Sequence, residues 1–320
     1  MSGEATEGQI GAFMMALRSK GETVAELAGL VDVMLDNAVL LETGSDAVDI
    51  VGTGGDLVGT VNISSMASIV AAAAGVPVLK HGSRSASGKT GSSEMLEVLG
   101  IRLDLAPQQV AEVFTEVGIT FFFAPVFHPA MRFVAPVRKQ LGVPTTFNFL
   151  GPLANPAQPI ATALGVANAV VAPFMAKEIA QRGRTALVFR SEDGLDELST
   201  TASNQIYLVR DGLVTEHTLD PESLGLKRVT IGQLLGGDAK HNAEVASKLF
   251  SLEDFENRDA IFDVVALNAA GGIVAYKIAH GATETLDELF QSALTDAKQA
   301  MDSGKARQKL VSWSAKTQSL

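Results

Sequence analysis

The 320-residue chain contains no cysteine, and tryptophan and tyrosine are rare, with one and two copies. The lack of cysteine excludes a disulfide framework, a thiolate nucleophile and a cysteine-bound metal. The first residues, Met1 to Glu4, are acidic and lack the basic-then-apolar order of a secretory signal. The apolar run from Ile69 to Leu79 is broken by Gly75 and Pro77 and is shorter than the about 18 residues that a membrane span needs. We therefore expect a soluble cytoplasmic protein with no membrane partner.

Positive charge is also scarce. The chain has 25 Lys and Arg residues against 36 Asp and Glu residues, which gives a net charge of −11 at pH 7. Because such a surface repels phosphates, nucleic acid is not an expected partner. Apolar residues make up 47% of the chain, and its length predicts two domains at roughly 150 residues per domain.

The apolar pattern predicts an α/β fold. Residues 4–41 have helical spacing and divide at Gly21 into two short helices, and the stretch from Val264 to Leu310 is helical again. Between them, short β-rich runs alternate with helical patterns, which indicates a sheet with crossover connections. The predicted strands are Val48 to Val51, Pro77 to Lys80, Thr120 to Phe123, Ala186 to Phe189 and Gln205 to Val209.

Three loops follow predicted strands, and two of them are rich in glycine. They are Gly52 to Asp56, Lys80 to Ser92, and the acidic loop Ser191 to Glu197. In open α/β sheets, ligands bind outside the carboxyl ends of the strands. We therefore expect the three loops to converge on one pocket.

The first loop has three glycines in four positions, which lets backbone amides approach an anionic ligand. It does not match the dinucleotide fingerprint, because the third glycine would have to stand at Leu57. An ordinary tight turn is the alternative, with Ser64 or Ser65 serving only as the N-cap of the next helix. Thr60 and Asn62 add polar groups just where that helix begins, and a helix N-terminus beside glycine amides suits a phosphate.

The second loop resembles a nucleotide-binding phosphate loop but does not fit one, because five residues separate Gly82 from Gly88 where that loop has four. Lys80, Arg84 and Lys89 nevertheless make it basic in an acidic chain. The third loop ends in adjacent carboxylates, which indicate either a charged surface turn or a magnesium site that substrate phosphates complete.

An apolar segment follows residue 120 and carries two isolated polar groups, His128 and Arg138. Such a setting suits a small aromatic carboxylate, although aromatic residues are more often part of a core. His128 is not an expected metal ligand, because no second histidine stands at ligand spacing.

Taken in order, the motifs resemble the anthranilate phosphoribosyltransferase family over nearly the whole chain. They are Gly52-Thr53-Gly54-Gly55-Asp56, Asn62-Ile63-Ser64, Lys80-His81-Gly82, Ser87-Gly88-Lys89-Thr90-Gly91-Ser92, His128-Pro129-Ala130-Met131, Val137-Arg138, Phe147-Asn148-Phe149-Leu150-Gly151-Pro152-Leu153 and Asp196-Glu197. The reaction implied by this resemblance joins anthranilate to 5-phosphoribosyl 1-diphosphate and releases diphosphate, in tryptophan biosynthesis.

The fold implied by the resemblance has a small all-helical domain and a large α/β domain with a central, mostly parallel sheet. Residues 1–43 and roughly 128–153 would form the small domain, and 46–127 and 154–320 the large one. The active site would lie in the hinge cleft, and the protein would be a homodimer. Members of the family usually have one more helix before the segment at which this chain starts.

The resemblance also implies the site residues. The residues that it implies bind 5-phosphoribosyl 1-diphosphate are Gly52, Gly55, Asp56, Thr60, Asn62, Ile63, Ser64, Ser65, Lys80, His81, Gly82, Ser83, Arg84, Ser85, Ala86, Ser87, Gly88 and Ser92. The residues that it implies bind anthranilate are Gly52, Ser83, His128, Arg138 and Pro152. Up to two Mg²⁺ ions per subunit would be held by Ser64, Asp196 and Glu197. No catalytic acid–base pair is expected, since positioning and metal electrostatics suit this transfer.

Two segments depart from the family pattern: Ser83 stands where the family normally has Asn, and Ser93-Glu94 stand where it has Ala-Asp. Two other functions remain open at this point. A pyrimidine nucleoside phosphorylase shares the fold and the Lys-His-Gly motif, but phosphorolysis does not require the acidic pair Asp196-Glu197. A non-catalytic relative that binds nucleic acid is opposed by the net charge of −11.

Overall fold

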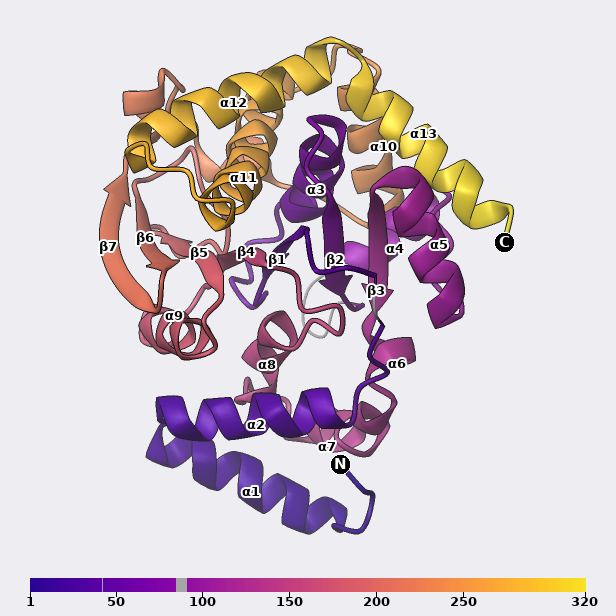
Figure 1. The fold of residues 1–320 in the computed structure, drawn as a ribbon, viewed down its shortest axis with the longest axis vertical. Coiled ribbons are helices and arrows are strands. Elements are labelled where there is room, and N and C mark those ends of the chain that lie inside the picture. Colours follow the sequence, from indigo (N-terminus) through magenta and orange to yellow (C-terminus); the bar gives the residue numbers. More distant parts are fainter. Residues whose placement is uncertain (42, 85–90) are drawn as a thin grey trace.

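The computed structural model of the protein describes residues 1–41, 43–84 and 91–320 (Figure 1). Its centre is a seven-stranded sheet in the order β3-β2-β1-β4-β5-β6-β7. The strands β1 to β5 are parallel, whereas β6 and β7 pair antiparallel at one edge. Their bounds are β1 (Val48–Gly52), β2 (Val78–Gly82), β3 (Ile119–Phe123), β4 (Ala161–Gly165), β5 (Thr185–Ser191), β6 (Asn204–Arg210) and β7 (Leu213–Leu219).

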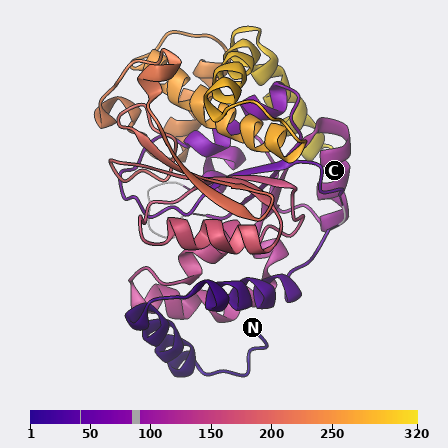
Figure 2. The same cartoon turned by 60° about the vertical axis from the view of Figure 1, so that its left-hand side comes forward.

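Helices cover both faces of the sheet (Figures 1 and 2). One face carries α3 (Ile63–Ala73), α10 (Ala239–Phe250), α11 (Arg258–Ala279), α12 (Leu286–Asp302) and α13 (Lys305–Gln318). The other face carries α9 (Ala172–Gln181), which contacts β5, β6 and β7. The helices α4 (Ser92–Val98) and α5 (Pro107–Val117) lie near the β3 edge, and the short 3-10 helices η2 (Pro221–Leu224) and η3 (Ile231–Leu234) follow β7.

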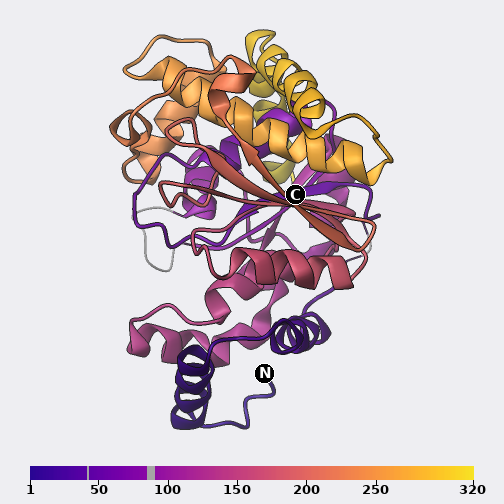
Figure 3. The ribbon, with the colours of Figure 1, turned by 90° about the vertical axis from the view of Figure 1, so that its left-hand side faces the viewer.

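A separate helical region lies at one end of the molecule, beyond α9 (Figure 3). It contains α1 (Glu7–Lys20), α2 (Val24–Asp36), α6 (Ala124–Phe127), η1 (Pro129–Phe133), α7 (Ala135–Leu141) and α8 (Phe147–Leu153). Thr6 and Thr23 begin the first two helices with capping boxes. The predicted combination of a helical domain with an α/β domain is confirmed, while the boundaries between them stay a prediction. The helix α2 also shares an apolar cluster with α9, which docks this region on the sheet domain.

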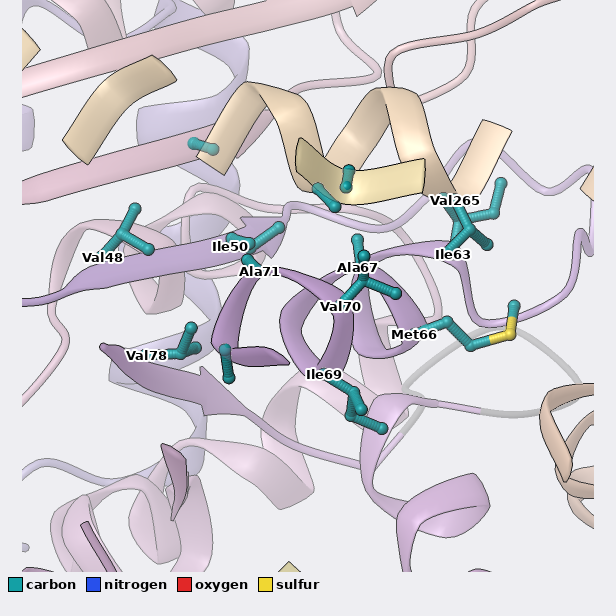
Figure 4. Close-up of a cluster of buried hydrophobic side chains, with 14 of the residues drawn as sticks. Val48, Ile50, Ile63, Met66, Ala67, Ile69, Val70, Ala71, Val78 and Val265 are labelled. Carbon is teal, nitrogen blue, oxygen red and sulfur yellow. The ribbon is translucent and has the colours of Figure 1, made fainter. Parts of the chain in front are cut away.

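The main core lies between the sheet and the pair α3 and α11. Figure 4 shows Val48, Ile50 and Val78 of the strands facing Ala67 and Val70 of α3, with Val265 of α11 nearby. Helix α11 is long and apolar enough to cross a membrane by length and composition alone, but 78% of its apolar window is buried inside this fold. It is therefore a core helix, and its apolar stretch is longer than the run from Ile69 to Leu79 considered above.

The structure confirms the two N-terminal helices, which are separated at Gly21, and all five predicted strands. The strands β4 and β7 were not predicted. The sequence of β4, Ala161–Gly165, has a single β-branched residue, so composition gives little sign of a strand. The predicted C-terminal helical stretch is three helices, α11 to α13.

Candidate active site

The loops converge on one large cavity of about 790 Å³. It opens at the carboxyl ends of β1, β2 and β3, beside the point between β1 and β4 where the strand order reverses, as the ligand crevice does in other open α/β sheets. Its lining includes most of the predicted site residues: Gly52, Gly55, Asp56, Thr60, Asn62, Ser64, Lys80, His81, Gly82, Ser83, Arg84, Ser92, His128, Arg138, Pro152, Asp196 and Glu197. Met34, His128 and Arg138 come from the helical region, so the cavity lies between the two parts of the molecule.

Two predicted residues do not line the cavity. The side chains of Ile63 and Ser65 are buried in the first turn of α3, so only their backbone could face a ligand there. The helix begins at Ile63 with Asn62 in the cap position, so the alternative in which Ser64 or Ser65 is the N-cap is wrong. Ser85, Ala86, Ser87 and Gly88 lie outside the described residues.

The glycines of the first loop have a conformational reason. Gly54 and Gly55 have φ values of 67° and 89°, a region that residues with a Cβ rarely occupy. A Cβ on Gly52 would lie 2.3 Å from Oδ2 of Asp196, and a Cβ on Gly165 would lie 1.7 Å from the backbone oxygen of Asp196. The ends of β1 and β4 therefore need glycine because the acidic loop crosses directly over them.

The acidic pair is held from both sides by backbone amides. The Gly54 N–H donates to Oδ2 of Asp196 at 2.6 Å, and the Ser64 N–H donates to Oε1 of Glu197 at 3.2 Å. Burial, together with the nearby Asp56 carboxylate, raises the pKa of Asp196 to about 7. Burial and the Asp196 charge raise the pKa of Glu197 well above its usual value. This excess of negative charge is the environment that a bound cation stabilises.

The oxygen donors around the cavity suit magnesium, and they do not form a metal site that protein ligands complete on their own. Within the ranges that the structure describes, no three His, Asp or Glu side chains gather as a metal-binding group. Carboxylates at Asp196, Glu197 and Asp56 and the Ser64 hydroxyl all border the same cavity. Magnesium is commonly held by one or two carboxylates together with substrate phosphates, so an incomplete oxygen set beside phosphate-binding loops suits it.

Lys80 is almost fully buried beneath this pair. Its Nζ donates to the Ile50 carbonyl at 2.6 Å and lies 3.5 Å from the Ser64 hydroxyl. Burial lowers the pKa of Lys80, while the charges of Asp49 and Glu197 oppose that shift. The Lys80 ammonium is therefore held in the cavity wall by a backbone carbonyl.

Asp49 lies behind Lys80 and belongs to a buried polar network. It accepts hydrogen bonds from the His81 N–H at 3.2 Å and from Nδ2 of Asn155 at 2.8 Å. The same Nδ2 donates to the Leu79 carbonyl at 2.8 Å. Burial raises the pKa of Asp49 to about 6. Because Asn155 follows α8, the network ties the chain returning from the helical region to β1 and β2.

Two buried imidazoles lie side by side in the cavity wall. The rings of His81 and His128 have centroids 5.1 Å apart. Burial lowers the pKa of His81 to about 3 and that of His128 to about 4, so both rings are neutral at pH 7. Nδ1 of His81 lies 2.9 Å from the Gly151 carbonyl, which can only accept, so this nitrogen carries the proton and Nε2 is an acceptor.

Arg138 lines the cavity from α7 of the helical region. Its guanidinium donates to Oδ1 of Asn148 at 3.4 Å, and the same oxygen accepts from the Thr145 N–H. Burial lowers the pKa of Arg138, and no salt bridge to it is found in the described part of the chain. Phe147 and Pro152 line the same cavity, so a planar apolar ligand with a carboxylate fits beside Arg138.

Sequence reasoning missed one wall of the cavity. Leu235, Gly236 and Gly237 line it, although they stand more than 170 residues after Asn62. They lie just before α10 and carry neither a charge nor a phosphate-binding pattern. The only sequence signal was the glycine pair itself.

Comparison with known proteins adds an independent finding. A family model described as glycosyl transferase family, a/b domain, matches residues 44–307, and the helical bundle domain of the same family matches residues 1–38. The chain is 53% identical over 320 residues to an anthranilate phosphoribosyltransferase of Leifsonia xyli, covering 99% of this chain and 90% of the relative. A relative with the same name from Arthrobacter is 50% identical, covering 99% and 88%.

Solved structures are similar as well. The anthranilate phosphoribosyltransferase of Thermus thermophilus superposes with a TM-score of 0.89 at 38% identity, covering 99% of this chain and 92% of the other. The enzyme of the same name from Saccharomyces cerevisiae, in complex with PRPP and Mg, gives a TM-score of 0.87 at 26% identity, covering 98% and 86%. PRPP is 5-phosphoribosyl 1-diphosphate.

Proposed function

The chain belongs to the anthranilate phosphoribosyltransferase family, and we infer from its cavity which residues perform the family's reaction. The enzyme is a pentosyltransferase of tryptophan biosynthesis. It transfers the 5-phosphoribosyl group of 5-phosphoribosyl 1-diphosphate to the amine of anthranilate and releases diphosphate. One observation carries the residue assignment: an acidic pair and a glycine-rich cradle share a single cavity with the half-buried Arg138, which forms no salt bridge with any residue that the structure describes.

We assign the cradle end to 5-phosphoribosyl 1-diphosphate. The Gly52–Asp56 loop and the first turn of α3 present backbone groups to a strongly anionic ligand. Thr60, Asn62 and Ser92 add neutral donors around them. This assignment is supported by the presence of all these groups in the lining of one cavity.

Mg²⁺ is the cofactor, and we propose two ions per subunit. Glu197 with Ser64 would hold one ion, and Asp196 with Glu197 the second. The fit is supported by the raised pKa of both carboxylates, which indicates that their charges lack sufficient compensation from the protein. A bound ion supplies charge stabilisation to the departing diphosphate.

We assign the arginine end to anthranilate. The guanidinium of Arg138 suits the anthranilate carboxylate, with Asn148 fixing its orientation. Pro152 and His128 offer walls for the aromatic ring, and Gly52 and Ser83 line the same cavity. The ligand would therefore lie with its amine directed at the phosphoribosyl group.

During the transfer, the bond from ribose C1 to diphosphate oxygen breaks, a bond from C1 to the anthranilate nitrogen forms, and the nitrogen passes one proton to the departing diphosphate or to solvent. An aromatic amine is weakly basic and is therefore largely unprotonated at pH 7. Its lone pair is available for attack, so a strong general base is not required. Both buried histidines are neutral at pH 7, which agrees with a site without an imidazolium acid. The protein contributes mainly by holding the two reactants next to each other in the cavity.

We also propose that the enzyme is a cytoplasmic homodimer. Phe13 on α1 is 52% exposed and Val33 on α2 is 47% exposed, which supports an interface on the helical region. The net charge of −11 supports the proposal that neither nucleic acid nor an anionic membrane surface is a partner.

The function is tested by following the loss of anthranilate fluorescence with 5-phosphoribosyl 1-diphosphate and Mg²⁺. Turnover that requires both 5-phosphoribosyl 1-diphosphate and Mg²⁺ is expected. A parallel reaction with thymidine and phosphate tests the phosphorylase alternative. Absence of the first activity at millimolar substrate, or activity only in the second, would overturn the proposal.

A further inference from the structure

Two asparagines connect three segments around the phosphate end of the cavity. The buried Asn242 in the first turn of α10 donates from Nδ2 to Oδ1 of Asn62 at 2.8 Å. Nδ2 of Asn62 in turn donates to the Gly91 carbonyl at 3.2 Å. Asn62 precedes α3, and Gly91 precedes α4. The two helices that begin at the cavity are therefore linked to α10, which lies beside α4 in Figure 1.

Backbone groups fix the direction of this relay at both ends. The Gly237 N–H, which can only donate, bonds Oδ1 of Asn242 at 2.8 Å. Nδ2 of Asn242 must therefore face Asn62, whose Oδ1 must accept. At the far end, the Gly91 carbonyl can only accept, so it receives Nδ2 of Asn62. Neither amide can flip without placing two donors or two acceptors face to face.

Asn242 also bonds the wall formed by Leu235–Gly237, which pairs with the backbone at Gly59 and Thr60. The Gly236 N–H donates to the Gly59 carbonyl at 2.9 Å, and Leu235 forms an antiparallel bridge with Thr60. A Cβ on Gly236 would lie 2.6 Å from Oδ1 of Asn242 and 2.8 Å from the Thr60 oxygen. Only glycine permits this close approach of the two backbones.

We propose that Asn242 is a positioning residue for 5-phosphoribosyl 1-diphosphate, acting through Asn62 and the wall Leu235–Gly237; the proposal rests on the function inferred above. The relay contacts the cradle end of the cavity, and none of its hydrogen bonds involves the groups around Arg138. Loss of the relay therefore weakens binding of the diphosphate substrate selectively, while anthranilate binding is retained.

Two variants separate the relay from simple charge effects. Asn242→Asp still accepts from Gly237 but cannot donate to Asn62, whereas Asn242→Leu removes both bonds without adding charge. One lost buried hydrogen bond corresponds to about a 10-fold change. Both variants are expected to raise the KM for 5-phosphoribosyl 1-diphosphate about 10-fold or more and to change the KM for anthranilate less than about twofold. A raised KM for 5-phosphoribosyl 1-diphosphate in Asn242→Asp but not in Asn242→Leu would overturn the proposal. Equal increases in KM for both substrates would overturn it as well.

A matched control is Thr317→Val on α13, which removes a buried hydroxyl that accepts from the Arg102 N–H and does not line the cavity. It should lower the melting temperature and leave both KM values unchanged. KM does not depend on the fraction of folded enzyme, so the test holds for a destabilised variant. If the wild type fails to use 5-phosphoribosyl 1-diphosphate, the proposed function fails. If the wild type uses it and Asn242→Leu has the wild-type KM, only this inference fails.

Discussion

The contact between Gly52 and Asp196 allows a quantitative prediction for Gly52→Ala. The added Cβ would lie 2.3 Å from Oδ2 of Asp196, and ordinary contact begins at 3.4 Å, so the carboxylate must move by about 1 Å. That movement breaks its 2.6 Å hydrogen bond from the Gly54 N–H. A hydrogen bond to a charged group contributes about 1.5–3 kcal/mol, and a misplacement of about 1 Å at a reacting site can cost about 100-fold in rate. We expect Gly52→Ala to lower kcat about 100-fold.

The assay is steady-state turnover at varied Mg²⁺, with Gly29→Ala as the control. A Cβ on Gly29 of α2 would meet no atom within 4 Å, so this variant should keep full activity and gain about 0.5–1 kcal/mol of stability. If Gly52→Ala acts through Asp196, adding it to Asp196→Asn should cost little more than Asp196→Asn alone. Activity of Gly52→Ala within threefold of the wild type, or multiplying effects in the double variant, would refute this reasoning.

The combination of Asp196→Asn with Glu197→Gln should lower Mg²⁺-dependent turnover about 100-fold or more, because the ion's charge stabilisation is lost; turnover near the wild-type rate would contradict the metal assignment. Arg138→Ala should raise the KM for anthranilate about 10-fold or more in the fluorescence assay and leave that for the diphosphate substrate unchanged, and an unchanged anthranilate KM would reject its role. Ser83→Asn, at an exposed position of the cavity rim, should lower the anthranilate KM about fivefold by adding an amide donor, whereas a higher KM would indicate a pocket adapted to serine. Because burial raises the folded-state pKa of Asp49 to about 6, its contribution favours folding below pH 4 and is lost as pH rises through 6. Urea unfolding of the wild type and of Asp49→Asn should therefore show the variant gaining about 2 kcal/mol relative to the wild type from pH 4 to 7, and a pH-independent difference would contradict this.

Much of the site could be predicted because parallel strands bring their carboxyl ends to one edge. Gly52 ends β1, Lys80 lies in β2 shortly before its end, and Asp196 follows β5, so parallel strands place all three at the same edge of the sheet. The chemistry of each loop was also visible locally, as glycines, cations or adjacent carboxylates. The net charge of −11 concealed this arrangement, because an average over the chain cancels a local basic loop against an acidic pair.

What the sequence did not indicate depends on contacts between distant segments. Asn242 and Asn62 are 180 positions apart, and an isolated asparagine has no pattern that indicates its partner. Lys80 looked like a free phosphate ligand, yet its ammonium bonds the Ile50 carbonyl, because burial forces it to find an acceptor. The buried network around Asp49 could not be predicted either, because a single carboxylate within a β-rich run is expected to face solvent, whereas Asp49 is fully buried.

The most direct test of the assignment is a crystal structure with 5-phosphoribosyl 1-diphosphate, Mg²⁺ and anthranilate bound. We expect the diphosphate to lie against the Gly52–Asp56 loop and the start of α3, with metal ions between it and the pair Asp196 and Glu197. The anthranilate carboxylate should face Arg138. A diphosphate bound away from the glycine loop, or metal ions that contact neither member of the acidic pair, would contradict the account.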